Sequence, residues 1–183
     1  MASPSEIAER VLEEALDRPP TLGGGRLVCV DGLAGAGKTS VGRELRALAP
    51  QAVLIATDEM LEGWSGLPGL GDRVDRLLRP LAAGEPGRWR RWDWEADDWA
   101  EDRVVEPAAL LVLEGVGSAP SVCTDLITYL AWIEADRDVR LARGLARDGE
   151  ALRPQWLRWL DDEAALHERE GARERADLIV TTG

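Results

Sequence analysis

The sequence of 183 residues contains no phenylalanine, one tyrosine and one histidine, so its aromatic chemistry falls to eight tryptophans. Its two cysteines, Cys29 and Cys123, fit a reducing compartment better than a disulfide framework. No apolar run reaches the length of a membrane span, and the N-terminus lacks the basic and then apolar segments of a signal peptide. These absences predict a cytoplasmic protein with no membrane partner.

Positive charge is also scarce. There are 22 basic against 34 acidic residues, the formal net charge is −12, and Lys38 is the only lysine. An acidic chain repels phosphate backbones, so we do not expect nucleic acid as a partner. The apolar fraction of 45% is that of a globular protein, and the length fits one domain over residues 1–183.

Apolar runs that alternate with helical patterns predict an α/β fold. A capping pattern at Ser3-Pro4-Ser5-Glu6 begins an N-terminal helix, which with its linker occupies residues 1–22. Strands are expected at 27–30, 52–55, 110–113, 129–133 and 178–180, and further helices at 38–48, 72–81, 137–147 and 155–170. For the polar, tryptophan-rich segment 84–105, the sequence predicts no secondary structure. The alternation predicts a parallel sheet covered by helices on both faces.

A glycine-rich loop joins the first strand to the next helix. It reads Gly32-Leu33-Ala34-Gly35-Ala36-Gly37-Lys38-Thr39 and satisfies the pattern Gly-x4-Gly-Lys-[Ser/Thr]. Glycines let successive backbone N–H groups point at phosphate oxygens, and the helix adds the positive end of its dipole. The lysine of this pattern reaches the β- and γ-phosphates, and the hydroxyl after it can ligate magnesium. The loop therefore predicts a site for ATP and Mg²⁺.

Two carboxylates follow expected strands. Asp58 comes after the strand at 52–55, and Glu114 ends the strand at 110–113. Ligands of doubly wound sheets collect at the carboxyl ends of the strands. We expect Glu114, with Thr39, to hold magnesium through oxygen ligands, and Asp58 to accept the proton of an attacking hydroxyl. The alternative is that both are solvated loop acids.

Arginines line one face of the expected helix at 137–147. Arg137, Arg140, Arg143 and Arg147 are spaced by three, three and four residues. Guanidinium groups suit phosphate oxygens, so this segment could close over ATP as a lid at about 137–153. The alternative is a solvated helix whose arginines pair with neighbouring acids.

Together these motifs resemble the uridine kinase-like family of P-loop small-molecule kinases. The resemblance runs from about residue 27 to the C-terminus. It includes Val30-Asp31-Gly32 before the loop, Asp58, Arg91-Trp92-Asp93-Trp94 and Leu113-Glu114-Gly115-Val116. It continues with Arg140-Leu141-Ala142-Arg143, Arg147-Asp148 and Ala176-Asp177-Leu178-Ile179-Val180.

The resemblance implies a three-layer sandwich whose five-stranded parallel sheet has the order 2-3-1-4-5, with an arginine-rich lid. Catalysis would fall to Lys38, Asp58, Arg143 and Arg147. Nucleotide binding would fall to Gly32, Ala34, Gly35, Ala36, Gly37, Lys38, Thr39, Ser40 and Arg140. The acceptor would contact Asp58, Arg91, Trp92 and Asp93.

The sequence thus predicts a kinase that transfers the γ-phosphate of ATP to a hydroxyl of a small molecule. A nucleoside such as uridine or cytidine is the expected acceptor. Two alternatives stay open: a nucleotide-binding regulatory protein with little transferase activity, and a nucleoside monophosphate kinase. For Trp92 and Trp94, a pocket and the core are equally compatible with the sequence.

Overall fold

A computed structural model describes residues 2–183 of the chain. Its strands are β1 (Arg26–Gly32), β2 (Val53–Ala56), β3 (Gly87–Asp93), β4 (Asp98–Val105), β5 (Leu110–Glu114), β6 (Tyr129–Glu134) and β7 (Leu178–Thr181). Its α-helices are α1 (Pro4–Leu16), α2 (Lys38–Leu48), α3 (Leu70–Ala82), α4 (Arg137–Asp148), α5 (Arg153–Glu170) and α6 (Ala172–Arg175). Short 3-10 helices are η1 (Thr57–Met60), η2 (Gly63–Ser65), η3 (Leu67–Gly69), η4 (Ser121–Leu126) and η5 (Glu150–Leu152).

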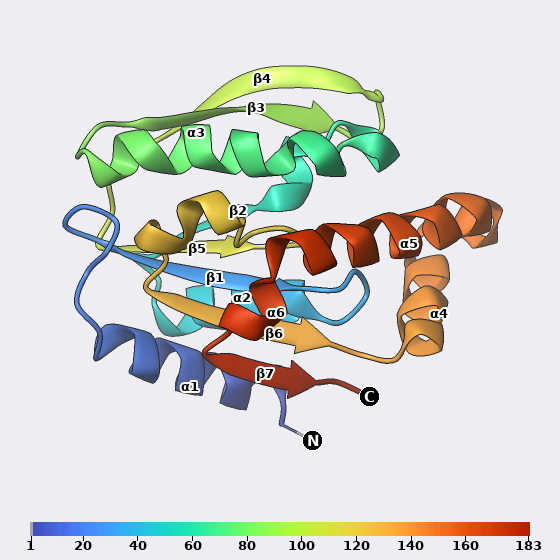
Figure 1. Cartoon of the computed structure of the whole chain (residues 1–183), viewed down its shortest axis with the longest axis horizontal. Helices are drawn as coiled ribbons and strands as arrows, with labels where there is room; N and C mark the ends of the chain where they lie inside the picture. The colour runs from blue at the N-terminus through green and yellow to red at the C-terminus, as the bar shows by residue number, and fades with distance from the viewer. Residues whose placement is uncertain (1) are drawn as a thin grey trace.

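Five strands form one sheet in the order β2-β5-β1-β6-β7, with every neighbouring pair parallel. In chain order, leaving out the hairpin strands β3 and β4, this is 2-3-1-4-5. The carboxyl ends of the strands lie at one side of the molecule, where the loop after β1 points toward α4 and α5 (Figure 1). The predicted α/β fold with a five-stranded parallel sheet and helices is confirmed.

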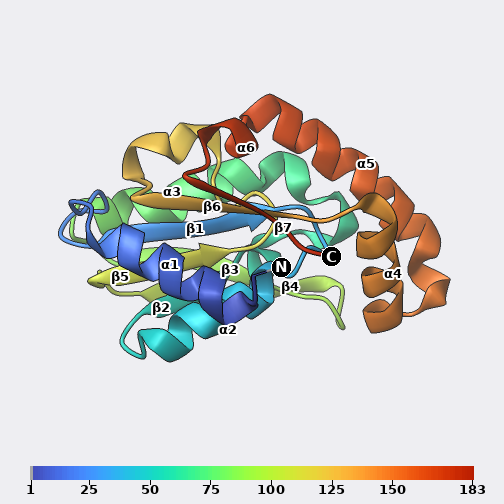
Figure 2. The ribbon, with the colours of Figure 1, turned by 90° about the horizontal axis from the view of Figure 1, so that it is seen from below.

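Helices cover both faces of this sheet, as the sequence predicts (Figure 2). Along β1, Val28 and Val30 belong to a buried cluster under α1 and α2. Leu27 and Cys29 point the other way, into a cluster with α3 and α5. A strand that is buried on both faces reads as one continuous apolar run, which explains the sequence of β1.

The segment that received no assignment forms a separate antiparallel hairpin, β3–β4, which packs against α3. Its register shifts between Arg90 and Trp92, which interrupts the alternation of apolar and polar residues. Arginine and tryptophan also alternate without a clear apolar face, so periodicity did not reveal the strands.

The ends of the helices follow local chemistry. Ser3 and Glu6 form the predicted capping box of α1. Helix α3 begins at Leu70, two residues before the expected start at Asp72, because Leu70 is buried in the core and Asp72 supplies the acidic first turn.

Within residues 2–183, no helix combines the length and apolarity that a membrane span requires.

Candidate active site

The glycine-rich loop has the backbone geometry that its sequence predicts. Gly32, Gly35 and Gly37 adopt φ angles of 130°, 77° and 102°, which residues with a Cβ rarely tolerate. A Cβ on Gly35 would lie 2.7 Å from the backbone oxygen of Arg140. The loop is therefore both left-handed in places and tightly packed against α4.

The loop presents a row of free backbone donors. Within residues 2–183, the N–H groups of Gly35, Gly37, Lys38 and Thr39 donate to no other group. Such N–H groups at the start of a helix, next to the positive end of its dipole, suit phosphate oxygens. Ser40 already belongs to the first turn of α2, and its N–H donates to Gly37.

Three polar groups gather next to these donors. Lys38 is buried, and its Nζ donates to the backbone oxygen of Leu33 at 2.8 Å. The Thr39 hydroxyl donates to Glu114 Oε2 at 3.4 Å. Burial raises the pKa of Glu114; the charge of Lys38 lowers it, and the charge of Asp58 raises it further. The hydroxyl of Thr39, in the first turn of α2, and the carboxylate of Glu114, at the end of β5, are a donor set that suits Mg²⁺.

Asp58 lies on η1, directly after β2, with an exposed side chain. Within the described residues no hydrogen bond or ion pair engages its carboxylate, although its backbone oxygen accepts a bond from Trp94 Nε1 at 3.0 Å. Its charge acts on Glu114, and also on Arg147, whose pKa is raised chiefly by Asp148 and to a smaller extent by Asp58. The strand ends thus bring Asp58, Glu114 and Lys38 within electrostatic range of one another.

Arg140 is placed behind the glycine-rich loop. It is buried, and it donates to the backbone oxygens of Ala135 and Ala34 at 3.0 and 3.2 Å. It also pairs with Glu163, whose other oxygen accepts from the Ala34 N–H at 2.8 Å. The nucleotide contact predicted for Arg140 stays a prediction, and the structure gives this residue and Ala34 a different use: they fix the back of the loop to α4 and α5.

The other arginines of α4 have separate surroundings. Arg143 donates to Gly35 O at 3.3 Å, to the Thr182 hydroxyl at 3.2 Å and to the backbone oxygen of Gly183. Thr182 in turn donates to Ala36 O at 2.8 Å. Arg147 pairs with Asp148 and lies 5.7 Å from the centre of the Trp156 ring. Arg143 therefore contacts the edge of the loop, and Arg147 contacts an aromatic wall.

That wall belongs to a tryptophan cluster made of Trp64, Trp94, Trp156 and Trp159. Trp64 meets the other three edge to face, with ring centres 5.8–6.0 Å apart. Trp156 and Trp159 are buried, whereas Trp94 is 42% exposed and hydrogen-bonded to the Asp58 backbone. The cluster thus offers an indole surface beside Asp58, built from three parts of the chain.

The segment predicted to touch the acceptor is divided between turn and core. Asp93 accepts hydrogen bonds from the Glu95 and Ala96 N–H groups and pairs with Arg91, which together hold its pKa below the usual range. Trp92 is buried against Trp99, with ring centres 5.1 Å apart. Asp93 and Arg91 stabilise the hairpin turn, Trp92 belongs to the core, and their acceptor contacts stay predictions.

Two buried polar residues were not assigned roles from the sequence. Asp31 accepts hydrogen bonds from the N–H groups of Gly32, Gly117 and Ala119 at 2.6–2.9 Å, so it ties the glycine-rich loop to the loop after β5. His167 lies edge-on to Trp132 beside a cavity of about 260 Å³, which Asp31 also lines. Burial lowers the pKa of His167. Asp31 therefore supports the glycine-rich loop from behind, whereas the side chain of His167 makes no hydrogen bond within the described residues.

Comparison with known proteins identifies the fold. No protein-family model matches the sequence, and no curated protein does. A structure described as a possible uridine kinase, from Bacillus stearothermophilus, superposes with a TM-score of 0.66 at 17% identity, covering 94% of this chain and 96% of that one.

A protein from Silicibacter sp. TM1040, provisionally described as a fructose transport system kinase, superposes with a TM-score of 0.61 at 19% identity over 100% of both chains. The predicted resemblance to uridine kinase-like proteins is confirmed at the level of the fold, which this chain shares with both of these structures.

Proposed function

We propose that this protein is a magnesium-dependent kinase that transfers the γ-phosphate of ATP to a hydroxyl group of a small cyclic metabolite, with a nucleoside as the leading candidate. The observation that carries the proposal is the meeting of free loop amides, Lys38, Glu114 and Asp58 at one edge of the sheet. The kinase fold of the two structures described above supports it.

The residues present fit a magnesium nucleotide. The free N–H groups of the loop and the Lys38 ammonium would hold the phosphates, and Thr39 with Glu114 would hold the metal. Bound Mg²⁺ would neutralise charge on the transferred phosphoryl group. Lys38 would leave the Leu33 oxygen to follow that charge, because an ammonium group binds phosphate more strongly than a neutral carbonyl.

Asp58 would serve the acceptor. Its exposed carboxylate accepts the proton of the attacking hydroxyl while the hydroxyl oxygen bonds to the γ-phosphorus and the bond from phosphorus to ADP breaks. Since the transition state of such transfers is loose, this carboxylate chiefly orients the nucleophile. The tryptophan cluster would provide the flat surface for a ring-shaped acceptor.

Residues 137–153, which form α4 and η5 and which we call the lid arm, would act as the lid. Arg143 touches the loop and Arg147 lies within the field of Asp58, so both could approach the transferred group after a small movement of the arm. A lid that excludes water prevents hydrolysis of ATP in place of transfer.

The direct test is a screen with γ-labelled ATP and Mg²⁺ against nucleosides, sugars and vitamins. We expect a labelled product from a cyclic acceptor with a free hydroxyl, and much slower formation of that product by the Asp58→Asn variant. Tight ATP binding without transfer to any acceptor would instead favour a regulatory nucleotide-binding protein. Rapid labelling of CMP or UMP in place of nucleosides would favour a monophosphate kinase.

A further inference from the structure

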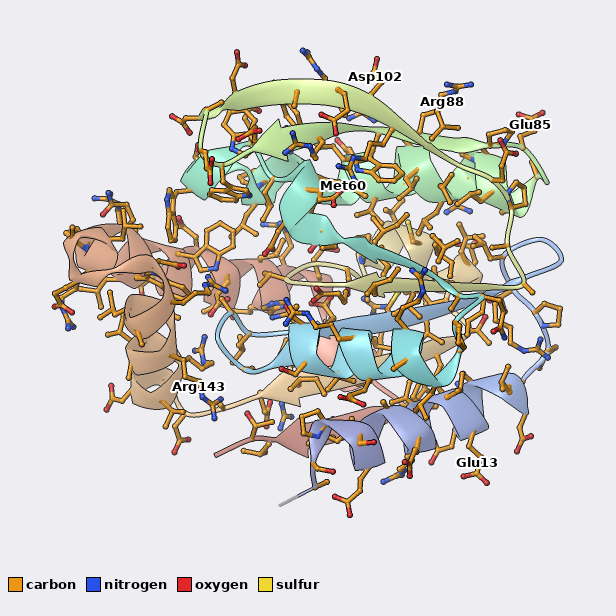
Figure 3. The ribbon with its side chains drawn as sticks, turned by 180° about the vertical axis from the view of Figure 1, so that it is seen from behind. Glu13, Met60, Glu85, Arg88, Asp102 and Arg143 are labelled. Atoms are coloured by element: carbon orange, nitrogen blue, oxygen red, sulfur yellow. The ribbon has the colours of Figure 1, made fainter. Side chains whose placement is uncertain are left out.

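A second basic region lies outside the arginines of α4, on α3 and the β3–β4 hairpin. A groove of about 480 Å³ runs between α3 and the β3–β4 hairpin. We call it the arginine groove, and the residues that define it are Arg73, Arg76, Arg88, Arg90, Trp89 and Trp99. In Figure 3, Arg88 on the hairpin and Arg143 on α4 lie at opposite ends of the view.

The charge of the arginine groove opposes that of the protein. Four guanidinium groups line it against a single carboxylate, Asp102, in a chain whose net charge is −12. Clustered charge of one sign in a hollow concentrates the field and attracts ligands of the opposite sign. An acidic protein would not gather cations on this surface for general solubility.

The guanidinium charges in the groove are mostly uncompensated. Arg73 pairs with Glu62. By contrast, Arg76 and Arg90 donate to backbone oxygens only, those of Asp72 and of Ala100 and Trp99. No hydrogen bond or ion pair engages the side chain of Arg88 within the part of the chain that the structure describes. Neutral carbonyls orient a guanidinium group without cancelling its charge. Asp102 lies opposite Arg90 in the hairpin register without forming an ion pair within residues 2–183, so Arg76, Arg88 and Arg90 carry more positive charge than this one carboxylate can balance.

The walls of the groove are flat and held in place. The Arg73 guanidinium lies over the Trp99 ring, 5.2 Å from its centre, and Trp99 also meets the Trp92 ring edge to face. Trp89 donates through its indole N–H to Glu59 at 3.2 Å. Indoles held in this way keep their orientation without a ligand, which lowers the entropy lost when a ring-bearing ligand binds.

From these observations we propose that the arginine groove binds a small phosphorylated metabolite that carries a ring, through its phosphate on Arg76, Arg88 and Arg90 and its ring against Trp89 and Trp99. None of the residues that line the groove belongs to the candidate active site. The proposal therefore goes beyond the proposed function and does not depend on it.

The groove does share one element with that site. Met60, which lines it, is the last residue of η1, and Glu59, the partner of Trp89, follows Asp58 directly. A ligand in the groove would thus press on the turn that carries the proposed base. We expect occupancy to change the turnover number of the kinase while leaving its affinity for nucleotide unaltered.

Phenyl phosphate is a suitable probe because it combines one ring with one phosphate. It would be titrated calorimetrically into the full chain saturated with Mg²⁺ and a non-hydrolysable ATP analogue, with inorganic phosphate as the probe without a ring. We expect one binding event for phenyl phosphate, weaker binding of inorganic phosphate, and lower affinity as salt rises.

The matched variants are Arg76→Gln/Arg88→Gln in the groove and Arg158→Gln on α5, whose arginine is exposed and unpaired within the described residues. The double variant should weaken phenyl phosphate binding at least about tenfold, and Arg158→Gln should not. Binding that persists in the double variant and disappears in Lys38→Ala would assign the probe to the glycine-rich loop and overturn the proposal. Absence of any binding would overturn it too. Neither result would bear on ATP binding itself.

Discussion

The glycine-rich loop and the tryptophan cluster are built in opposite ways. The loop is one continuous segment, residues 32–39, and it offers mainly backbone atoms. The cluster draws one side chain from η2, one from the hairpin turn and two from α5. A site made of backbone requires particular residue types in a fixed order, whereas a site made of side chains requires only that the fold bring them together. This difference suggests a general phosphate-binding device combined with a specific acceptor surface.

The two regions also differ in what lies behind them. The loop is fixed by the buried pair of Arg140 and Glu163 and by Asp31. The cluster is supported by apolar packing, with Trp156 and Leu160 in a small core of their own beside Leu145. Substitutions around the glycine-rich loop should therefore change stability or activity by removing charge interactions. Substitutions in the tryptophan cluster should do so by altering apolar packing.

The largest effect is expected at Lys38. Lys38→Ala removes the only side-chain cation that the structure places in the loop, and phosphoryl transfer should fall about 10³-fold, as when a preorganised donor to a developing charge is lost. Steady-state kinetics with the best acceptor would measure this. Turnover within tenfold of the original protein would show that the loop does not stabilise the transferred group.

Glu163→Gln tests whether the buried ion pair that fixes the loop contributes to stability. The change leaves Arg140 buried without its carboxylate, so the free energy of unfolding should fall by about 3 kcal/mol. Urea denaturation would measure it. Glu168→Gln on the exposed face of the same helix is the matched control and should change stability by less than about 0.5 kcal/mol. Equal effects of the two changes would remove the special role of the buried pair.

On the acceptor side, Asp58→Asn should lower the turnover number about 100-fold and leave the dissociation constant of ATP nearly unchanged. The carboxylate is exposed and unpaired in the described residues, so its loss should not destabilise the fold. Turnover and ATP titration would be measured on the same preparation. A parallel loss of ATP affinity would show that Asp58 binds the nucleotide and not the acceptor.

The smallest effect is expected in the tryptophan cluster. Trp94→Ala removes an exposed indole and should raise the KM for the acceptor about tenfold with little change in stability. Trp92→Ala, two residues away, removes a buried indole and should lower the free energy of unfolding by about 3 kcal/mol. If Trp94→Ala also destabilised the protein and left KM unchanged, the cluster would be core and not a binding surface.

The difference between a continuous segment and side chains gathered from distant segments also explains how much of the structure the sequence could predict. The strands buried on both faces, the glycine-rich loop and the positions of Asp58 and Glu114 at strand ends followed from local patterns. The hairpin was not predicted, because a register shift breaks the alternation of its apolar and polar residues. The spacing of Arg137, Arg140, Arg143 and Arg147 suggested one shared role, but the structure gives each a different environment, since burial depends on what packs against each helix turn.

Glu163 carried a signal that periodicity could have found. It lies in register with the buried residues Trp156, Trp159, Leu160 and Leu166 of α5, so a carboxylate on this apolar face required a buried partner. The partner itself, Arg140, comes from another helix and could not be named from spacing alone. The tryptophan cluster gave no such signal, because its members come from three distant parts of the sequence.

The central claim is that residues 32–39 bind the phosphates of a magnesium nucleotide. Isothermal titration of Mg-ATP into the original protein and into Lys38→Ala tests it most directly. We expect one site per chain in the original protein and much weaker binding in the variant. No binding heat in the original protein, or equal affinity in the two proteins, would contradict the account.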